Sequence, residues 1–166
     1  MVEVSTSILS VKEGEEAEVF LALEKAKTDY FHIDVMDGKF VEKNTYNKML
    51  SYSKYIKRIS SLPLDVHFMV EDVENAIEDF ICVEPNNITF HYEACKNKEE
   101  VYKLIEKIKQ NNCRVSLAVK PETKIEEIYE FLPYIHMCLI MTVEPGKGGQ
   151  TMLNDMIQKR EKLKNY

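Results

Sequence analysis

A regular alternation of short apolar runs with longer amphipathic stretches restricts the fold of this chain more than any other feature. The apolar runs, which we interpret as strands, cover residues 2–9, 30–35, 64–70, 87–91, 114–119 and 137–143. The amphipathic stretches, which we interpret as helices, cover residues 12–27, 47–58, 73–83, 98–110, 125–132 and 151–163. Strict alternation of this kind predicts a parallel sheet covered by helices. The pattern alone leaves two architectures open, a doubly wound sheet and a closed barrel.

Composition and charge narrow the class of protein further. The 166 residues are 45% hydrophobic, which is enough for one domain with a sizeable core over residues 1–166. The net charge of −6 argues against nucleic acids or anionic membranes as partners. No apolar stretch approaches the roughly 18 residues that cross a bilayer, and residues 1–20 do not resemble a signal peptide. The four cysteines have no Cys-x-x-Cys spacing, so we expect reduced thiols in a cytoplasmic protein.

Polar side chains lie in two of the predicted strands, where a core would not favour them. His32 and Asp34 are two residues apart, and so are Asp65 and His67 in the next strand. Because successive residues of a strand point to opposite faces, each pair shares one face of the sheet. Two imidazoles and a carboxylate from neighbouring strands predict a divalent metal site. A buried His–Asp pair with a structural role is the alternative, and the spacing leaves both open.

Three further features could belong to a ligand site. Residues 144–150, Glu-Pro-Gly-Lys-Gly-Gly-Gln, follow the sixth strand, and glycines let backbone N–H groups approach a phosphate before a helix N-terminus. A plain tight loop fits these residues equally well. Ser7 lies toward the carboxyl end of the first strand and could hydrogen-bond a ligand or cap the following helix. Met36, Met69 and Met141 follow inward positions, although methionines at such places are more often core filler.

Taken together, four motifs resemble those of the ribulose-phosphate 3-epimerase family, in the same order along the whole chain. They are Ser-Thr-Ser-Ile-Leu-Ser at 5–10, Phe-His-Ile-Asp-Val-Met-Asp-Gly-Lys-Phe-Val at 31–41, Leu-Asp-Val-His-Phe-Met-Val at 64–70 and Met-Thr-Val-Glu-Pro-Gly-Lys-Gly-Gly-Gln at 141–150. Four long motifs in register are far more specific than any one of them. The resemblance implies an α/β fold of the (β/α)8 TIM-barrel type, which decides between the two architectures.

The resemblance also implies roles for individual residues. A divalent metal ion (Zn, Fe, Mn or Co) would be held by His32, Asp34 and His67, and Asp34 would also be the catalytic acid and base. The implied substrate-binding residues are Ser7, His67, Met36, Met69, Met141, Gly146, Lys147, Gly148 and Gly149. Within this set the glycine-rich segment would cradle the phosphate, and the methionines would wall the site.

The activity that the resemblance implies is that of an isomerase acting on a small sugar phosphate. Such an enzyme interconverts D-ribulose 5-phosphate and D-xylulose 5-phosphate in the pentose phosphate pathway of carbohydrate metabolism. A proton leaves C3, an enediolate forms with the assistance of the metal, and a proton returns to the opposite face. Two alternatives remain: a ketohexose-phosphate 3-epimerase of the allulose 6-phosphate type, and a non-catalytic truncated remnant.

The second alternative arises from the length of the chain. In the family, a second catalytic aspartate, which is also the fourth metal ligand, lies on the seventh strand. This chain ends at Tyr166, so we expect a C-terminally incomplete barrel of about six βα units. An open barrel exposes strand edges, and we therefore expect a homo-oligomer. Whether the 166 residues are active by themselves stays open at this point.

Overall fold

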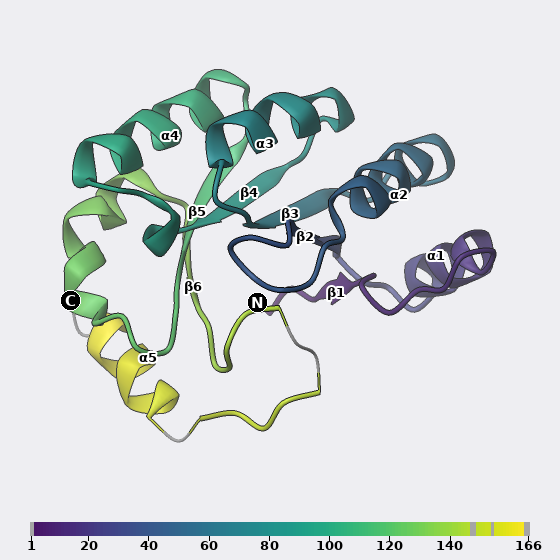
Figure 1. Ribbon diagram of the computed structural model, residues 1–166. Helices are drawn as coiled ribbons and strands as arrows, with labels where there is room; N and C mark the ends of the chain where they lie inside the picture. Colours follow the sequence, from purple (N-terminus) through teal and green to yellow (C-terminus); the bar gives the residue numbers. More distant parts are fainter. Residues whose placement is uncertain (1, 147–148, 154, 165–166) are drawn as a thin grey trace.

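The structure, a computed structural model, describes residues 2–146, 149–153 and 155–164 (Figure 1). Its centre is a parallel sheet of six strands, whose order in space follows their order in the chain. The strands are β1 (Ser5–Ser7), β2 (Tyr30–Met36), β3 (Leu64–Met69), β4 (Asn87–His91), β5 (Arg114–Val119) and β6 (Met137–Ile140). The α-helices are α1 (Glu16–Lys25), α2 (Tyr46–Ile59), α3 (Val73–Phe80), α4 (Lys98–Gln110) and α5 (Met156–Lys164). Three 3₁₀ segments complete the described elements: η1 (Ile81–Val83), η2 (Tyr92–Ala94) and η3 (Ile125–Tyr134).

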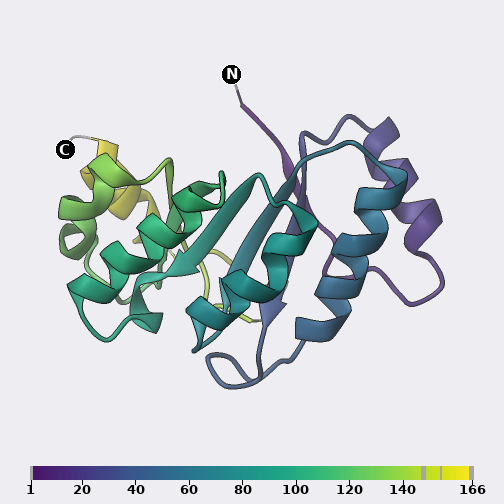
Figure 2. The same ribbon diagram turned by 90° about the horizontal axis from the view of Figure 1, so that it is seen from above.

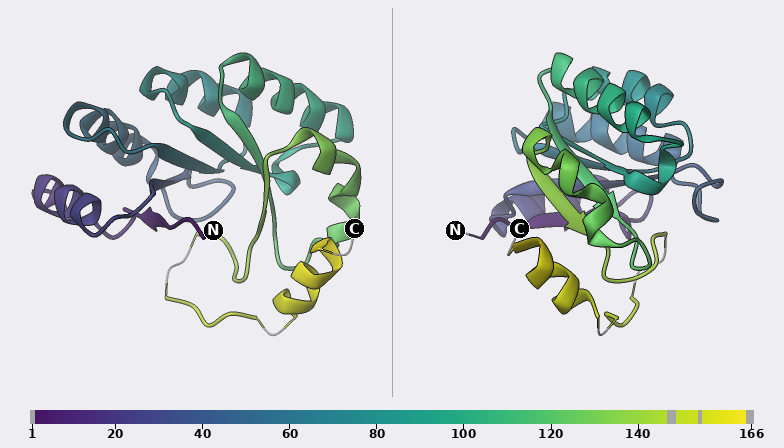
Figure 3. Two further views of the ribbon diagram at one scale, coloured as in Figure 1. Left: turned by 180° about the vertical axis from the view of Figure 1, so that it is seen from behind. Right: turned by 90° about the vertical axis from the view of Figure 1, so that its left-hand side faces the viewer.

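The sheet curls into a half-barrel with its helices on the outside. Figure 1 shows α1, α2, α3 and α4 in an arc around the convex side of the sheet, and Figure 2 shows them from above. The segment after β6 runs along the other, concave side before it reaches α5 (Figure 3). This arrangement confirms the predicted α/β architecture, with parallel strands that alternate with helices in a TIM-like curl.

The apolar core lies between the convex side of the sheet and the helices. On β2, Phe31, Ile33 and Val35 are all fully buried, and they point to this side because they alternate with His32 and Asp34. Equivalent positions on the other strands and the inner faces of the helices extend the same cluster. The concave side of the sheet carries polar side chains of the strands together with Met36 and Met69.

Several elements differ in extent from the sequence prediction. The first strand covers only Ser5–Ser7, because β1 pairs with β2 alone and Val2 is 90% exposed. The segment at 125–134 is a 3₁₀ helix rather than an α-helix, and it contains Pro133, which has no N–H to donate. The last helix begins at Met156 rather than near 151. Within the described residues, no helix is long and apolar enough to cross a membrane.

Candidate functional site

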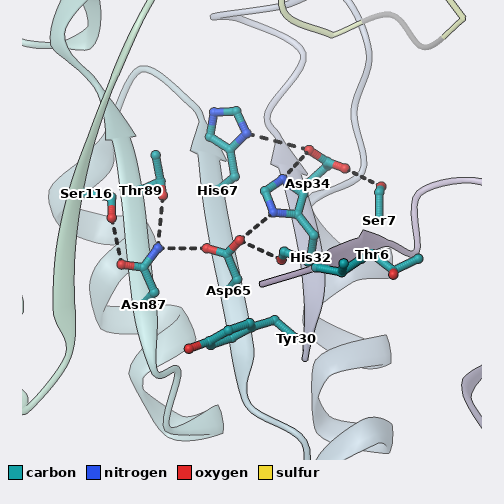
Figure 4. A network of polar contacts seen from close by, with 12 residues as sticks. Thr6, Ser7, Tyr30, His32, Asp34, Asp65, His67, Asn87, Thr89 and Ser116 are labelled. Atoms are coloured by element: carbon teal, nitrogen blue, oxygen red, sulfur yellow. Dashed lines mark hydrogen bonds and ion pairs between the residues drawn. The ribbon is translucent and has the colours of Figure 1, made fainter. Parts of the chain in front are cut away.

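The strand register brings the predicted polar residues together near the carboxyl ends of β1, β2 and β3. Ser7 pairs with His32 across β1 and β2, and Asp34 pairs with His67 across β2 and β3. These residues occupy the inward positions of their strands, so their side chains meet on the concave side (Figure 4). Active sites of barrels built from parallel strands lie at this end.

Asp34 is at the centre of the cluster. Its Oδ2 accepts a hydrogen bond from the Ser7 hydroxyl at 2.6 Å, and its Oδ1 lies 3.2 Å from His32 Nε2 and 3.6 Å from His67 Nδ1. Burial alone would raise the pKa of Asp34, but the hydrogen bond and charge of His32, together with the hydrogen bond from Ser7, outweigh it and lower the pKa. Asp34 is therefore an ionised carboxylate that is 13% exposed and can accept a proton.

A second carboxylate, Asp65, lies behind His32 in a ladder of polar side chains. Asp65 Oδ2 is 2.8 Å from His32 Nδ1 and also accepts a hydrogen bond from Ser5 Oγ at 2.8 Å. Its other oxygen accepts a hydrogen bond from Asn87 Nδ2 at 2.7 Å, and Asn87 Oδ1 accepts one from Ser116 Oγ at 2.7 Å. Figure 4 shows this ladder crossing β1 to β5, so each of these strands contributes to the orientation of His32.

The position of His32 between two carboxylates controls its charge. Burial disfavours the imidazolium form, but the hydrogen bonds and charges of Asp34 and Asp65 outweigh burial and raise the pKa of His32 to about 10. In the absence of a metal ion, His32 is thus a cation that links the two carboxylates. The arrangement is compatible with both the predicted metal site and the alternative of a structural His–Asp pair, because His32 faces Asp34 with one nitrogen and Asp65 with the other.

The donor set of the cluster suits a divalent metal ion. His32, Asp34 and His67 each offer one ligand atom, and these atoms all lie within 4.8 Å of one another. Imidazole and carboxylate donors together are typical of transition-metal sites such as those of Zn, Fe and Mn. The three residues predicted as ligands from sequence are therefore brought together, and the cluster could bind a metal.

A cavity of about 340 Å³ opens in front of the cluster, a size typical of small-molecule sites. The predicted site residues that line it are Ser7, His32, Asp34, Met36, His67, Met69, Met141 and Gly146. The three methionines thus form part of its wall. Gly149 is described but does not belong to the lining, and Lys147 and Gly148 lie outside the described residues.

The segment after β6 closes one side of the cavity. Thr142 O accepts a hydrogen bond from Leu153 N at 3.0 Å, and Glu144 O accepts one from Gln150 Nε2 at 2.8 Å. Gly146 has φ +94°, a conformation that side chains with a Cβ rarely adopt. Among the described residues, α5 begins at Met156, so its N-terminus lies farther along the chain from the glycine-rich turn than expected.

Sequence reasoning missed two residues beside the cluster, His91 and Glu93. His91 Nε2 lies 2.9 Å from His67 Nε2, and its Nδ1 lies 3.3 Å from Glu93 Oε2. The signal that could have found them is the spacing at the end of β4, where a His and a carboxylate again lie two residues apart.

Replacement of Gly146 tests the role of this turn. An alanine Cβ would lie 2.9 Å from Val41 Cβ, and the positive φ would strain the backbone. We expect Gly146→Ala to raise the KM for a sugar-phosphate substrate by ~10-fold, since strain of this kind costs about 1–2 kcal/mol. Gly14→Ala is the matched control, because Gly14 also has a positive φ but has nothing within 4 Å. Steady-state kinetics measure the KM of each variant. An equal KM in both would contradict a role of this turn in substrate binding.

The fold and the site define a candidate enzyme of the (β/α)-barrel class, with a carboxylate and two imidazoles at the carboxyl ends of parallel strands. The family to which it belongs follows from comparison with known proteins. The profile of the ribulose-phosphate 3-epimerase family matches residues 3–166, and the chain belongs to this family of isomerases.

Curated relatives support the same assignment. The chain is 36% identical over 165 residues to the ribulose-phosphate 3-epimerase of Methanocaldococcus jannaschii, covering 99% of this chain and 68% of that protein. It is 40% identical over 143 residues to that of Eremothecium gossypii, covering 81% and 59%. It is 30% identical over 164 residues to that of Bacillus subtilis, covering 99% and 73%. The chain thus spans about three fifths to three quarters of these relatives' lengths.

Comparison with solved structures concerns the fold alone. The TTHB071 protein of Thermus thermophilus superposes with a TM-score of 0.53 at 10% identity. The match covers 82% of this chain and 65% of that one.

Proposed function

We propose that the protein epimerises a ketopentose phosphate at C3 and so interconverts D-ribulose 5-phosphate and D-xylulose 5-phosphate. The observation that carries this proposal is the ionised Asp34 carboxylate, held between two imidazoles at the cavity. The three curated relatives above are all named ribulose-phosphate 3-epimerases, which favours a pentose phosphate over a ketohexose phosphate.

In this proposal Asp34 is the catalytic acid and base on one face of the sugar. The C3–H bond is next to the C2 ketone, so the electron pair left behind by the proton spreads onto the C2 oxygen and gives an enediolate. Asp34 takes the proton from its own face, and a proton that reaches C3 from the opposite face completes the inversion. The Ser7 hydroxyl, which donates to Asp34 Oδ2, orients the carboxylate during this transfer.

We propose that a divalent metal ion, Zn, Fe, Mn or Co, is held by the atoms of the cluster that face one another. These atoms are His32 Nε2, an oxygen of Asp34 and His67 Nδ1. Such an ion, when bound, supplies a Lewis acid that stabilises negative charge on the substrate oxygens. The chain's own contribution is to hold the three donors in place from two adjacent strands.

The remaining site residues are assigned to substrate binding. Ser7 and His67 lie beside Asp34, and the methionines at 36, 69 and 141 wall the cavity. We assign the phosphate to the turn that begins at Gly146, together with Lys147, Gly148 and Gly149. What supports this is that Gly146 reaches the cavity with a backbone conformation suited to glycine.

Three broader proposals concern the whole chain. Residues 1–166 form one domain, equivalent to about six βα units of a (β/α)8 barrel, which fits the share of each relative that the chain spans. The protein is a homo-oligomer, because β1 and β6 each have only one neighbouring strand in the described sheet. It functions in the cytoplasm, which is consistent with its four free cysteines.

Turnover and isotope exchange test the proposed function. The purified protein is incubated in D₂O with D-ribulose 5-phosphate and each of the four metals in turn. We expect metal-dependent deuterium incorporation at C3 together with formation of D-xylulose 5-phosphate. Deuterium exchange at C3 without inversion would show that Asp34 transfers protons on one face of the sugar while no group delivers a proton to the opposite face. The absence of exchange with every metal would contradict the proposal and favour the non-catalytic alternative.

Metal retention tests the cluster independently of turnover. We expect His67→Ala to lower the affinity for Zn²⁺ by at least ~10-fold, since it removes one of three donors. His136→Ala is the control, because His136 is exposed and lies outside the cluster. Metal analysis after dialysis against a chelator measures the difference, and equal retention in the two variants would rule out the proposed site.

A further inference from the structure

We propose that Glu93 and His91 are positioning residues that fix one neutral tautomer of His67, in which Nδ1 carries a lone pair that can bind a metal ion. The inference rests on the metal-binding role proposed for His67. Glu93 and His91 would not contact the substrate and would act only through His67.

The three side chains form a continuous chain of polar contacts. His67 Nε2 lies 2.9 Å from His91 Nε2, and His91 Nδ1 lies 3.3 Å from Glu93 Oε2. The two imidazole rings are inclined by 22°, and their centroids are 5.0 Å apart. The 2.9 Å contact between their Nε2 atoms is therefore made at the edges of the rings. The side chains of His67 and His91 are 2% and 0% exposed, so their ring nitrogens depend on partners inside the protein.

Glu93 lies at one end of this series of contacts as an ionised carboxylate, which accepts hydrogen bonds and cannot donate them. Its Oε1 accepts hydrogen bonds from the Lys120 N–H at 2.7 Å and from the Thr123 hydroxyl. Burial opposes ionisation, but these bonds and the one from His91 lower the pKa of Glu93 to about 2. His91 must therefore donate its Nδ1–H to Glu93.

The direction of each following hydrogen bond is then determined. His91 is fully buried between Glu93 and His67, and its neutral ring holds one proton, so with that proton on Nδ1 it has a lone pair on Nε2. That lone pair accepts the proton of His67 Nε2. The neutral His67 ring then has its one proton on Nε2, so the second His67 nitrogen, Nδ1, carries the lone pair. Nδ1 is the atom that faces Asp34 Oδ1 at 3.6 Å, on the cavity side.

The reverse arrangement places two acceptors in contact. If His67 carried its proton on Nδ1, His91 would have to donate from Nε2 and would turn a lone pair toward the Glu93 carboxylate. That contact is buried and repulsive. Asp34 Oδ1 also faces His67 Nδ1, but at 3.6 Å, and it already has the cationic His32 as a donor at 3.2 Å. The ionised Glu93 therefore selects the ligand-competent tautomer of His67 through His91, as carboxylates behind metal-bound histidines commonly do.

The variant Glu93→Gln is expected to reverse the direction of the hydrogen bonds that link residue 93, His91 and His67. The new carboxamide must keep its oxygen toward the Lys120 N–H and the Thr123 hydroxyl, so its NH₂ group turns to His91. His91 then accepts at Nδ1 and donates from Nε2, and the proton of His67 moves to Nδ1, where it blocks the metal.

The test combines the tautomer of His67 with metal affinity, both measured on the purified protein. Long-range ¹H–¹⁵N NMR spectra of the metal-free protein report which His67 nitrogen is protonated, and competition with a chelator gives the Zn²⁺ affinity. We expect a protonated Nε2 in the wild type, a protonated Nδ1 in Glu93→Gln, and a roughly 10–100-fold loss of affinity in that variant. Thr123→Val is the control, because it removes a hydrogen bond to Oε1 and leaves Oε2 with His91.

Two results would overturn the proposal. The first is a wild-type His67 protonated on Nδ1, which decides the question even if Glu93→Gln does not fold. The second is an unchanged tautomer and affinity in a folded Glu93→Gln protein. Neither measurement involves epimerase turnover, so failure of this inference and failure of the proposed activity are distinguishable.

Discussion

Asp34→Asn is expected to lower kcat by ~10²–10⁴-fold, the range typical of a positioned acid–base group. The amide has nearly the shape of the carboxylate but cannot take a proton from C3. It can still accept a hydrogen bond from Ser7, so the local geometry should persist. The measurement is steady-state turnover of D-ribulose 5-phosphate, with circular dichroism to confirm the fold.

A matched control separates the loss of the base from the general effect of an Asp to Asn change. Asp29 lies at the amino end of β2, is exposed and accepts a hydrogen bond from Val4 N at 2.7 Å. Asp29→Asn should leave turnover unchanged. The role of Asp34 as acid and base would be wrong if Asp34→Asn kept more than about a tenth of the wild-type kcat. Loss of solvent deuterium exchange at C3 together with turnover would place the defect at proton abstraction.

The cluster around Asp34 could be predicted from the sequence because strand periodicity is simple. Residues two apart on one strand share a face, so the spacing of His32 and Asp34 places both side chains on the concave side. The same spacing puts Asp65 and His67 on one face of the next strand, and in the structure the register of β2 and β3 sets Asp34 beside His67. The family motifs added the TIM-like curl, which periodicity alone could not distinguish from an open sheet.

Other parts of the site could not be predicted, because they depend on contacts between distant segments. The packing of Gly146 against Val41 joins the segments after β6 and β2, which no local pattern encodes. The place of Asp65 behind His32 required the register of neighbouring strands as well as the spacing. The start of α5 was also misplaced, because apolar residues lie on both sides of the boundary, at Met152, Leu153, Met156 and Ile157, and so mark no single start.

Asp65→Ala is expected to lower the free energy of unfolding by about 3–5 kcal/mol, which is the usual effect of removing one partner of a buried ion pair. Asp65 is 7% exposed and accepts hydrogen bonds from Ser5, His32 and Asn87. Alanine removes the acceptor that these three groups share on the inner face of the sheet. A domain is typically stable by only about 5–15 kcal/mol, so this loss is a large share of the total.

Urea unfolding of the metal-free protein at pH 7 measures this loss, and Ser5→Ala is the comparison. Ser5→Ala removes one neutral donor to the same carboxylate and should cost only about 1 kcal/mol, because Asp65 keeps its two other partners. If the two variants lost equal stability, Asp65 would not be the group that anchors the ladder. The expected difference between them reflects a physical link between fold and site, since the carboxylate that joins β1, β3 and β4 also holds His32 in the orientation that faces Asp34.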